Sequence, residues 1–207
     1  MPVGLPKVAY RLSDKDDAEY NWSNLYDRLQ RRRILFLAKA LTQTLSNQLN
    51  AAMIYLNTDD STKTQYMYIN STGGSINWGL GVHDTMQYIA ATVCTTCVGV
   101  SASVASLVLA GGTPGNRFAL PHARMMIHQP EGDVDGLGGP LGYELIEVER
   151  ARELLIKAYV LRTGQSISQI EYDLGRDAFM LVEAATFYGL IDGVAETSPA
   201  NAEDSNS

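Results

Sequence analysis

The chain is organised around one central stretch, Ala91-Thr-Val-Cys-Thr-Thr-Cys-Val-Gly-Val-Ser-Ala-Ser-Val-Ala-Ser-Leu-Val-Leu-Ala-Gly-Gly112. Its first part, residues 92–98, is apolar and rich in β-branched residues, which predicts a buried strand. Small residues follow Gly99, and the apolar run that begins at Ser103 predicts a short helix. A strand that passes through a small-residue turn into a helix is typical of α/β proteins.

Ser103 stands where this strand meets this helix, and it is the first candidate for chemistry. A serine hydroxyl is a poor nucleophile until a neighbouring base accepts its proton. His128 ends a short apolar strand and is the candidate base, and Asp177 is an acidic group available to hold that base. The same run offers Ser101 and Ser106 as alternative nucleophiles.

A second turn strengthens the case for a site near Ser103. The predicted strand at residues 66–70 ends in Ser71-Thr-Gly-Gly74, and paired glycines let backbone amides approach a ligand closely. Sites in α/β sheets gather at strand ends on one edge. We therefore expect Gly73-Gly74 to supply amides for an oxyanion hole.

Strands alternate with helices through most of the chain, which predicts an α/β fold with a largely parallel sheet. The expected strands are residues 34–37, 66–70, 92–98, 117–121 and 124–128. The expected helices are residues 21–29, 41–57, 78–89, 103–112 and 143–162, a helix that Ser166 caps, and a final helix after Phe179.

The cysteines, the arginine run and two of the histidines are expected to have structural roles. Cys94 and Cys97 form a C-x-x-C, but residues three apart in a strand point to opposite faces, so neither a zinc pair nor a redox disulfide is favoured. Arg31-Arg-Arg33 is interpreted as a solvated helix end. His83 lies on a predicted helix without an evident acidic partner, and His122 is expected at the surface.

Composition limits the class of protein. The 207 residues are 45% hydrophobic and 19% charged, as expected for one ordinary globular domain. The net charge of −7 argues against a nucleic-acid partner, because phosphate binding needs a basic face. We recognise no membrane-spanning run and no secretory or transit signal, so no membrane partner is expected.

The ends of the chain differ in composition from its middle. Residues 1–20 are polar and predict a flexible arm, and residues 21–195 carry the domain. Residues 196–207 are acidic and rich in Ser and Asn, which predicts a disordered tail. The glycine-rich residues 131–142 are expected to be mobile.

A series of segments follows in a recognisable order. They are Tyr66-Met-Tyr-Ile-Asn-Ser-Thr-Gly-Gly74, Asp84-Thr-Met-Gln-Tyr-Ile89, Leu109-Ala-Gly-Gly112, Ala119-Leu-Pro-His-Ala-Arg-Met-Met-Ile-His-Gln-Pro130, Arg162-Thr-Gly-Gln165, Arg176-Asp-Ala-Phe-Met180 and Tyr188-Gly-Leu-Ile-Asp192. Together they resemble the proteolytic subunit of the ATP-dependent Clp protease (ClpP) over about residues 22 to 195. The start, residues 1–11, resembles the plastid-encoded and cyanobacterial branch in particular.

The resemblance implies a fold and a mechanism. The fold would be of the crotonase type, with a protruding strand-helix handle, and two heptameric rings would stack face to face around the active sites. The family's serine endopeptidase triad falls on Ser103, His128 and Asp177, which rejects the other serines. Its oxyanion amides fall on Gly74 and Val104.

The resemblance also implies partners. A separate AAA+ chaperone would unfold substrates and dock in apolar clefts on the ring's flat face, where Tyr66 and Tyr68 match residues of the cleft. Residues 1–20 would resemble axial pore loops. The chain has no Walker motif, so we expect the chaperone to use the ATP and this subunit to need no metal or nucleotide. Its ring neighbours would be other Clp subunits or copies of itself.

The chain departs from the family pattern at a few positions. Thr72 replaces a proline of the oxyanion turn, Val104-Ala105 replaces the usual Met-Gly after the nucleophile, and Pro140 ends an unusually glycine-rich stretch. An extra methyl at Ala105 and a β-branched Val104 are expected to crowd the acyl pocket. These changes leave open a weak or inactive structural subunit of a mixed ring.

The same residues disfavour two other enzyme classes, and the resemblance suggests a location. A crotonase-type acyl-CoA enzyme is disfavoured by the triad spacing, and an α/β-hydrolase by the absence of a G-x-S-x-G elbow. The resemblance favours the plastid stroma, with the cytoplasm of a cyanobacterium as the alternative.

Overall fold

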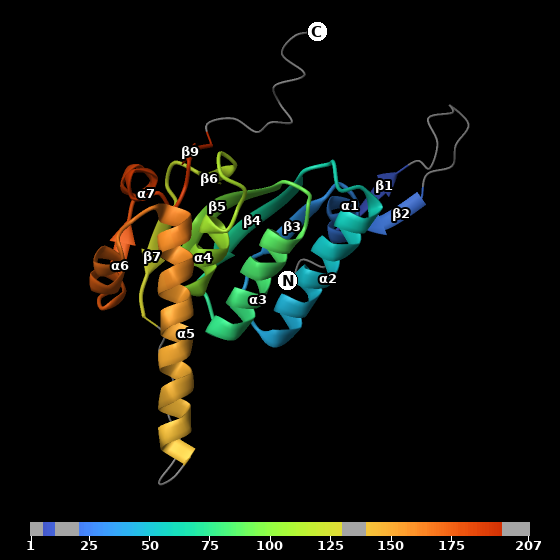
Figure 1. The fold of residues 1–207 in the computed structure, drawn as a ribbon. Coiled ribbons are helices and arrows are strands. Elements are labelled where there is room, and N and C mark those ends of the chain that lie inside the picture. Colours follow the sequence, from blue (N-terminus) through green and yellow to red (C-terminus); the bar gives the residue numbers. More distant parts are fainter. Residues whose placement is uncertain (1–5, 11–20, 130–139, 196–207) are drawn as a thin grey trace, which may run out of the picture.

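The computed structural model describes residues 6–10, 21–129 and 140–195, and for residues 140–145 it describes the backbone alone. Their centre is a seven-stranded sheet (Figure 1). Its strands are β3 (Ile34–Leu37), β4 (Gln65–Ser71), β5 (Val93–Ala102), β6 (Arg117–Ala119), β7 (Arg124–Ile127), β8 (Ala178–Met180) and β9 (Gly193–Val194). Every strand pair of this sheet is parallel except β7 with β8. The predicted α/β fold with a largely parallel sheet is confirmed.

Helices cover the sheet and extend beyond it. They are α1 (Leu25–Arg31), α2 (Gln43–Asp59), α3 (Ile76–Tyr88), α4 (Val104–Ala110), α5 (Pro140–Thr163), α6 (Ile167–Leu174) and α7 (Val182–Tyr188). Figure 1 shows α2 and α3 side by side on one face, with α4 next to them, while α5 projects far past the sheet. This projection matches the expected handle helix. Residues 130–139, where the strand of the handle would fall, lie outside the described residues.

Strand β5 is the branching point of the sheet. Its first half pairs with β6, through Thr95–Cys97, and its second half pairs with β7, through Val100–Ala102. Between the halves, Gly99 has a φ of 101°, and the register between β4 and β5 shifts nearby. Positive φ is open to glycine without steric cost. Gly99 therefore redirects β5 toward β7.

Helix α4 lies in the centre of the core. Each of its residues is buried, so the helix is covered on all sides. A Cβ at Gly79 of α3 would stand 1.9 Å from a methyl group of Val104, so only glycine lets α3 approach α4 this closely. Large buried side chains of the surrounding elements complete the core; they include Leu37, Met53, Met67, Ile69, Met125, Ile127 and Tyr159.

The N-terminal segment differs from the prediction. Asn21–Asn24 form strand β2 rather than the start of a helix, and β2 pairs antiparallel with β1 (Lys7–Tyr10). Helix α1 begins only at Leu25. Lys7–Tyr10 belong to the range expected to be a flexible arm, yet backbone pairing gives them a strand. Residues 1–5 and 11–20 of that arm and the tail at 196–207 lie outside the described residues.

Two arginine side chains are buried and form hydrogen bonds within the fold. Arg33 was expected at a solvated helix end, but it is buried and donates to the Lys63 carbonyl and to Asp59. Arg117 of β6 forms a bidentate ion pair with Asp192 and also donates to the carbonyls of Arg162 and Gly189. These contacts connect β6 to the C-terminal segments.

The cysteine prediction is confirmed: Cys94 and Cys97 are free and buried in β5. Burial raises the pKa of both thiols, which keeps them protonated. Ser166 caps α6 as expected, since its hydroxyl accepts from the Gln169 N–H. Within the described ranges, no helix is long and apolar enough to cross a membrane.

Candidate active site

Ser103 occupies a strained turn between β5 and α4. It has a φ of 55° and a ψ of −136°, and the only other described non-glycine residue with positive φ is Arg33. Such conformations cost about 1–3 kcal/mol and gather at functional sites. The Ser103 N–H donates to the Met126 carbonyl at 2.9 Å, so the pairing of β5 with β7 continues to this residue.

The strand register brings His128 next to Asp177. His128 follows β7 directly, and Asp177 directly precedes β8. These strands run antiparallel with Ile127 opposite Ala178, so the next residue on each side faces its counterpart. The His128 Nδ1 lies 3.5 Å from the Asp177 Oδ1. The Asp177 side chain is 65% exposed in the single chain and that of His128 is 19% exposed.

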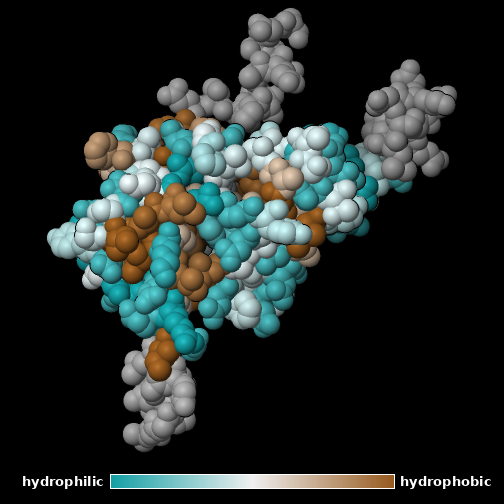
Figure 2. Space-filling view, in the orientation of Figure 1, coloured by the Kyte–Doolittle hydropathy of each residue, from teal (hydrophilic) through white to brown (hydrophobic). Residues whose placement is uncertain are grey.

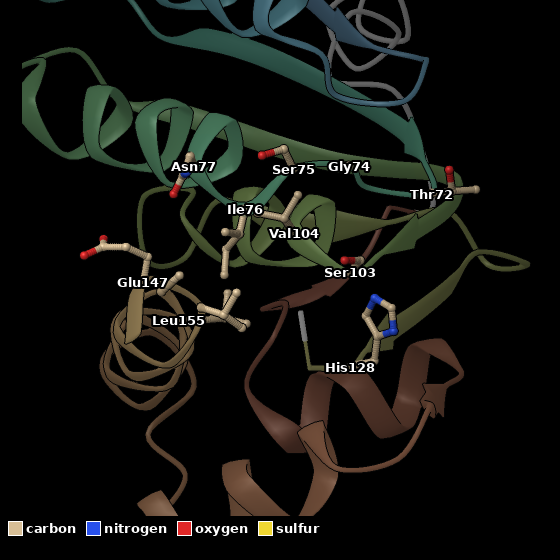
Figure 3. Close-up of a pocket in the computed structure, with 12 residues that line it drawn as sticks. Thr72, Gly74, Ser75, Ile76, Asn77, Ser103, Val104, His128, Glu147 and Leu155 are labelled. Carbon is tan, nitrogen blue, oxygen red and sulfur yellow. The ribbon is translucent and has the colours of Figure 1, made fainter. Parts of the chain in front are cut away.

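One pocket of about 480 Å³ collects most of the candidate residues. Ser103, His128, Gly74 and Val104 all line it, and Figure 3 shows the His128 ring turned toward Ser103. Among the described hydrogen bonds, none joins the Ser103 hydroxyl to this ring. Catalytic hydrogen bonds are often long in the absence of substrate and tighten in the complex. Asp177 reaches the site from behind His128 and lines a neighbouring pocket.

The glycine turn is fixed against Ser103. The Gly73 N–H donates to the Ser71 hydroxyl, and the Gly73 carbonyl accepts from the Leu41 N–H. A Cβ at Gly73 would stand 2.7 Å from the Cβ of Ser103, and a Cβ at Gly74 would stand 2.3 Å from the Leu41 carbonyl oxygen. Both positions therefore require glycine. Within the described part of the chain, the N–H groups of Gly74 and Val104 donate to no acceptor.

Ser101 and Ser106 are buried completely and do not line the pocket. The Ser106 hydroxyl donates to the Ser103 carbonyl at 2.7 Å. Neither hydroxyl is placed to meet a substrate, which leaves Ser103 as the serine of this run that faces the pocket.

Comparisons with known proteins identify the family of the chain. The family model described as Clp protease matches residues 16–198. The chain belongs to the Clp protease family. A Clp protease proteolytic subunit of Nephroselmis olivacea is 52% identical over 195 residues, which cover 94% of this chain and 93% of that protein. The proteolytic subunit of Oltmannsiellopsis viridis is 50% identical over 195 residues, 94% and 99% of the two chains, and that of Ostreococcus tauri is 47% identical over 200 residues, 97% and 99%.

The rest of this Clp protease pocket was missed by the sequence analysis. Its apolar wall is formed by Ile76 of α3 and by Val148, Ala151 and Leu155 of α5, with Asn77 and Glu147 at polar positions. The spacing of 148, 151 and 155 places these residues on one helical face. That pattern was visible, but it does not distinguish a pocket wall from a core.

The positions at which the chain departs from the family pattern lie in different surroundings. Thr72 and Val104 line the pocket, although the Val104 side chain is buried and packs against Gly79 of α3. Ala105 is fully buried and is not among the lining residues, so its methyl group does not crowd the pocket as expected. Pro140 is the first residue of α5, where a helix tolerates proline well.

His83 shows that a histidine beside a carboxylate is not sufficient for a base. Contrary to the prediction, His83 has an acidic partner: its Nδ1 lies 3.1 Å from the Asp84 Oδ1. Its Nε2 accepts from Arg162 at 3.3 Å, so both ring nitrogens have partners, and the ring is buried. Burial lowers the pKa of His83, which favours a neutral, structural ring. His122 is exposed, as predicted.

Tyr66 and Tyr68 of β4 are half-buried and alternate along the strand with fully buried residues. Tyr68 stacks on Phe36 at 5.7 Å between ring centroids, and Tyr26 meets Phe36 edge-on at the same distance. Phe36 and Tyr26 line an apolar groove between α1, β3 and α2, but the two β4 tyrosines are not among its lining residues. Their role in chaperone docking stays a prediction.

Among the described residues, no group of three or more His, Cys, Asp or Glu side chains is arranged as a metal site.

Proposed function

We propose that this chain is a serine-type endopeptidase subunit in which Ser103 is the nucleophile, His128 the general base and Asp177 the group that orients His128. The observation that carries the proposal is the convergence of these residues. Ser103 and His128 line one pocket, and the His128 Nδ1 is 3.5 Å from the Asp177 carboxylate. This arrangement leaves the other ring nitrogen to serve the serine hydroxyl.

Peptide hydrolysis would proceed in two stages. The Ser103 Oγ attacks the peptide carbonyl carbon while the His128 Nε2 accepts the hydroxyl proton. The C–N bond then breaks, the proton passes from His128 to the leaving amine, and an ester remains on Ser103. In the second stage His128 accepts a proton from water, and the resulting hydroxide attacks the ester. The proton returns to the Ser103 oxygen as the acid product leaves.

The N–H groups of Gly74 and Val104 would stabilise the negative charge on the carbonyl oxygen. Both residues line the pocket beside Ser103, and Val104 is the first residue of α4, where backbone N–H groups lack helical acceptors. A donor of this kind is typically worth about 2.7–4 kcal/mol of transition-state stabilisation. The fixed Gly73-Gly74 turn keeps one donor in position before substrate arrives.

The pocket favours extended peptides with an apolar side chain next to the scissile bond. Ile76, Val148 and Leu155 form an apolar wall within reach of Ser103. Unfolded polypeptides expose such side chains, so they are the proposed substrates. The reaction needs no metal or nucleotide in this subunit, and ATP would be used by an AAA+ chaperone that delivers the substrates.

Assembly into two stacked heptameric rings, with other Clp subunits or further copies of this chain, completes the proposal. Figure 2 shows apolar surface on both sides of a hydrophilic stripe over α5. Ile146, Leu154 and Leu161 of α5 are exposed in the single chain. Exposed apolar patches mark protein interfaces. The name of the relatives, proteolytic subunit, favours an active over an inactive ring member.

The proposed location is the plastid stroma, because the relatives named above come from green algae. The cytoplasm of a cyanobacterium is the alternative, and fractionation of the source cells distinguishes the two.

A peptidase assay tests the activity. The native assembly is given a short fluorogenic peptide with an apolar residue before the scissile bond, without ATP. Ser103→Ala and His128→Ala should each lower kcat by roughly 10⁴-fold or more. The control is His122→Ala, which removes an exposed histidine outside the pocket and should leave kcat unchanged. Cleavage that persists in Ser103→Ala contradicts the proposal, and a wild-type chain that cleaves nothing beside active ring partners indicates a structural subunit.

A further inference from the structure

Helix α5 brings a buried hydroxyl against the backbone of Ser103. Tyr159 of α5 is 0% exposed, and its hydroxyl lies 2.8 Å from the Ser106 hydroxyl and 3.2 Å from the Ser103 carbonyl oxygen. The Ser106 hydroxyl itself donates to that carbonyl at 2.7 Å, and the Ser106 N–H donates to it at 2.9 Å. Three donors thus converge on one carbonyl.

The order of donors follows from proton counting. Each hydroxyl carries one proton, and the Ser106 proton goes to the Ser103 carbonyl. The Tyr159 proton is then shared between the Ser106 oxygen, which accepts at 2.8 Å, and the more distant Ser103 carbonyl. Burial raises the pKa of Tyr159, so this hydroxyl keeps its proton and remains a donor.

The carbonyl that receives these bonds belongs to the strained residue. With a φ of 55° and a ψ of −136°, Ser103 relaxes unless its peptide groups are fixed on both sides. Its N–H is fixed by the Met126 carbonyl, and its own carbonyl by Ser106 and Tyr159. Rotation of this carbonyl would also turn the next N–H, that of Val104, away from the pocket.

We propose that Tyr159 and Ser106 are positioning residues of the peptidase, which hold the Ser103 backbone in its strained conformation and so aim both the nucleophile and the Val104 N–H. Neither side chain touches substrate, since neither lines the pocket. The same helix supplies Val148 and Leu155 to the pocket wall. Helix α5 therefore sets the wall of the site and the orientation of its nucleophile together.

This inference rests on the proposed function, and the test separates the two. Tyr159→Phe, Ser106→Ala and the double variant are compared with the wild type in the native assembly. Three quantities are measured: kcat and KM for the fluorogenic peptide, the rate at which a fluorophosphonate modifies Ser103, and the midpoint of thermal unfolding. The matched control is Thr95→Val, which removes a buried hydroxyl that donates to the Leu109 carbonyl at the opposite end of α4.

Each single variant should lower kcat by about two- to tenfold, as expected for one lost hydrogen bond, with KM changed by less than about twofold. In either single variant the remaining hydroxyl still reaches the Ser103 carbonyl. The fold-loss of kcat in the double variant should therefore exceed the product of the two single fold-losses. The Ser103 modification rate should fall in parallel, and the pH midpoint of kcat/KM should not move, since His128 is untouched. Thr95→Val should lower the unfolding midpoint and leave kcat unchanged.

The positioning role is overturned if the variants lose as much thermal stability as the control while their kcat and modification rate stay unchanged. The two hydroxyls would then serve the stability of the core alone. A wild-type chain whose Ser103 is not modified overturns the proposed function, and this inference with it.

Discussion

The two halves of β5 contrast within one strand. The first half, Val93–Val98, pairs in register with β4 and β6. Its first three residues are all buried, and from Thr95 to Val98 buried and half-buried side chains alternate. The second half, after Gly99, changes partner to β7 and ends at a serine with positive φ. The first half is an ordinary paired strand, whereas the second half holds the strain and leads into the pocket.

The difference shows how a single strand separates stability from chemistry. Around the first half, ordinary pairing and the Arg117–Asp192 ion pair stabilise the sheet. Around the second half, Gly99 and Ser103 adopt conformations that are costly for most residues, and the surrounding core maintains them. Changes near the two halves should therefore have different consequences.

The largest effect is expected at the end of the second half. Ser103→Ala and Ser103→Gly should both lower peptidase activity by roughly 10⁴-fold or more. Glycine accepts the positive φ, so Ser103→Gly should be more stable than Ser103→Ala by about 1 kcal/mol. Urea unfolding of both variants measures the difference, and equal stabilities would show that this turn holds no strain.

The first half should respond in the opposite way. Arg117→Met leaves the Asp192 carboxylate without its ion pair and frees the carbonyls of Arg162 and Gly189. We expect the free energy of unfolding to fall by about 3 kcal/mol, with the activity per folded molecule unchanged. Replacing the carboxylate as well, in Arg117→Met/Asp192→Leu, should recover part of the stability. A folded Arg117→Met protein with much weaker kcat would break the separation between the halves.

Gly99 lies at the boundary, so its replacement should affect both properties. Gly99→Ala forces a Cβ to within 3.0 Å of the Asn70 Oδ1 at a φ of 101°, and should cost about 1–3 kcal/mol. Because the kink directs β5 to β7, kcat should fall too. The control is Gly115→Ala, which has a φ of 86° with open space around it. A variant at Gly99 that loses stability but keeps the wild-type kcat contradicts the proposed role of the kink.

The smallest effect is a change with pH at the first half. Burial raises the pKa of Asp192, but the hydrogen bonds and charge of Arg117 outweigh it, so the pKa lies below its ordinary value. The ionised form therefore stabilises the fold above the ordinary pKa, and this contribution disappears as pH falls through the folded pKa. Urea unfolding below about pH 4 should show a shallower loss of stability in Asp192→Asn than in the wild type. Parallel profiles would exclude the ion pair as a source of acid sensitivity.

The sequence predicted those features that depend on neighbouring residues. The small residues around Ser103 marked the start of α4, the paired glycines at 73 and 74 marked the turn, and apolar spacing located most helices. The resemblance to the Clp protease family assigned the site residues together, but the residues alone could not pair His128 with Asp177. Their proximity depends on the antiparallel register of β7 and β8, across about fifty residues of chain, which no local pattern records.

The errors have the same origin. Arg33 lies in a basic run that resembles a solvated helix end, yet a positive φ turns it inward toward Asp59. The strand pairing of Asn21–Asn24 with Lys7–Tyr10 prevails over the helical spacing of the residues that follow. The helix at 143–162 was predicted, but the contacts of the Tyr159 hydroxyl with Ser103 and Ser106 were not, because they join segments far apart in the chain. Tertiary contacts decided each of these positions.

Labelling of Ser103 tests the central claim most directly. The native assembly is treated with a fluorophosphonate, which the activated serine attacks with loss of fluoride, and the modified peptide is identified by mass spectrometry. The account predicts an adduct on Ser103 in the wild type that is lost in His128→Ala and retained in His122→Ala. An unmodified Ser103, in a sample where an active ring partner is labelled, would contradict it.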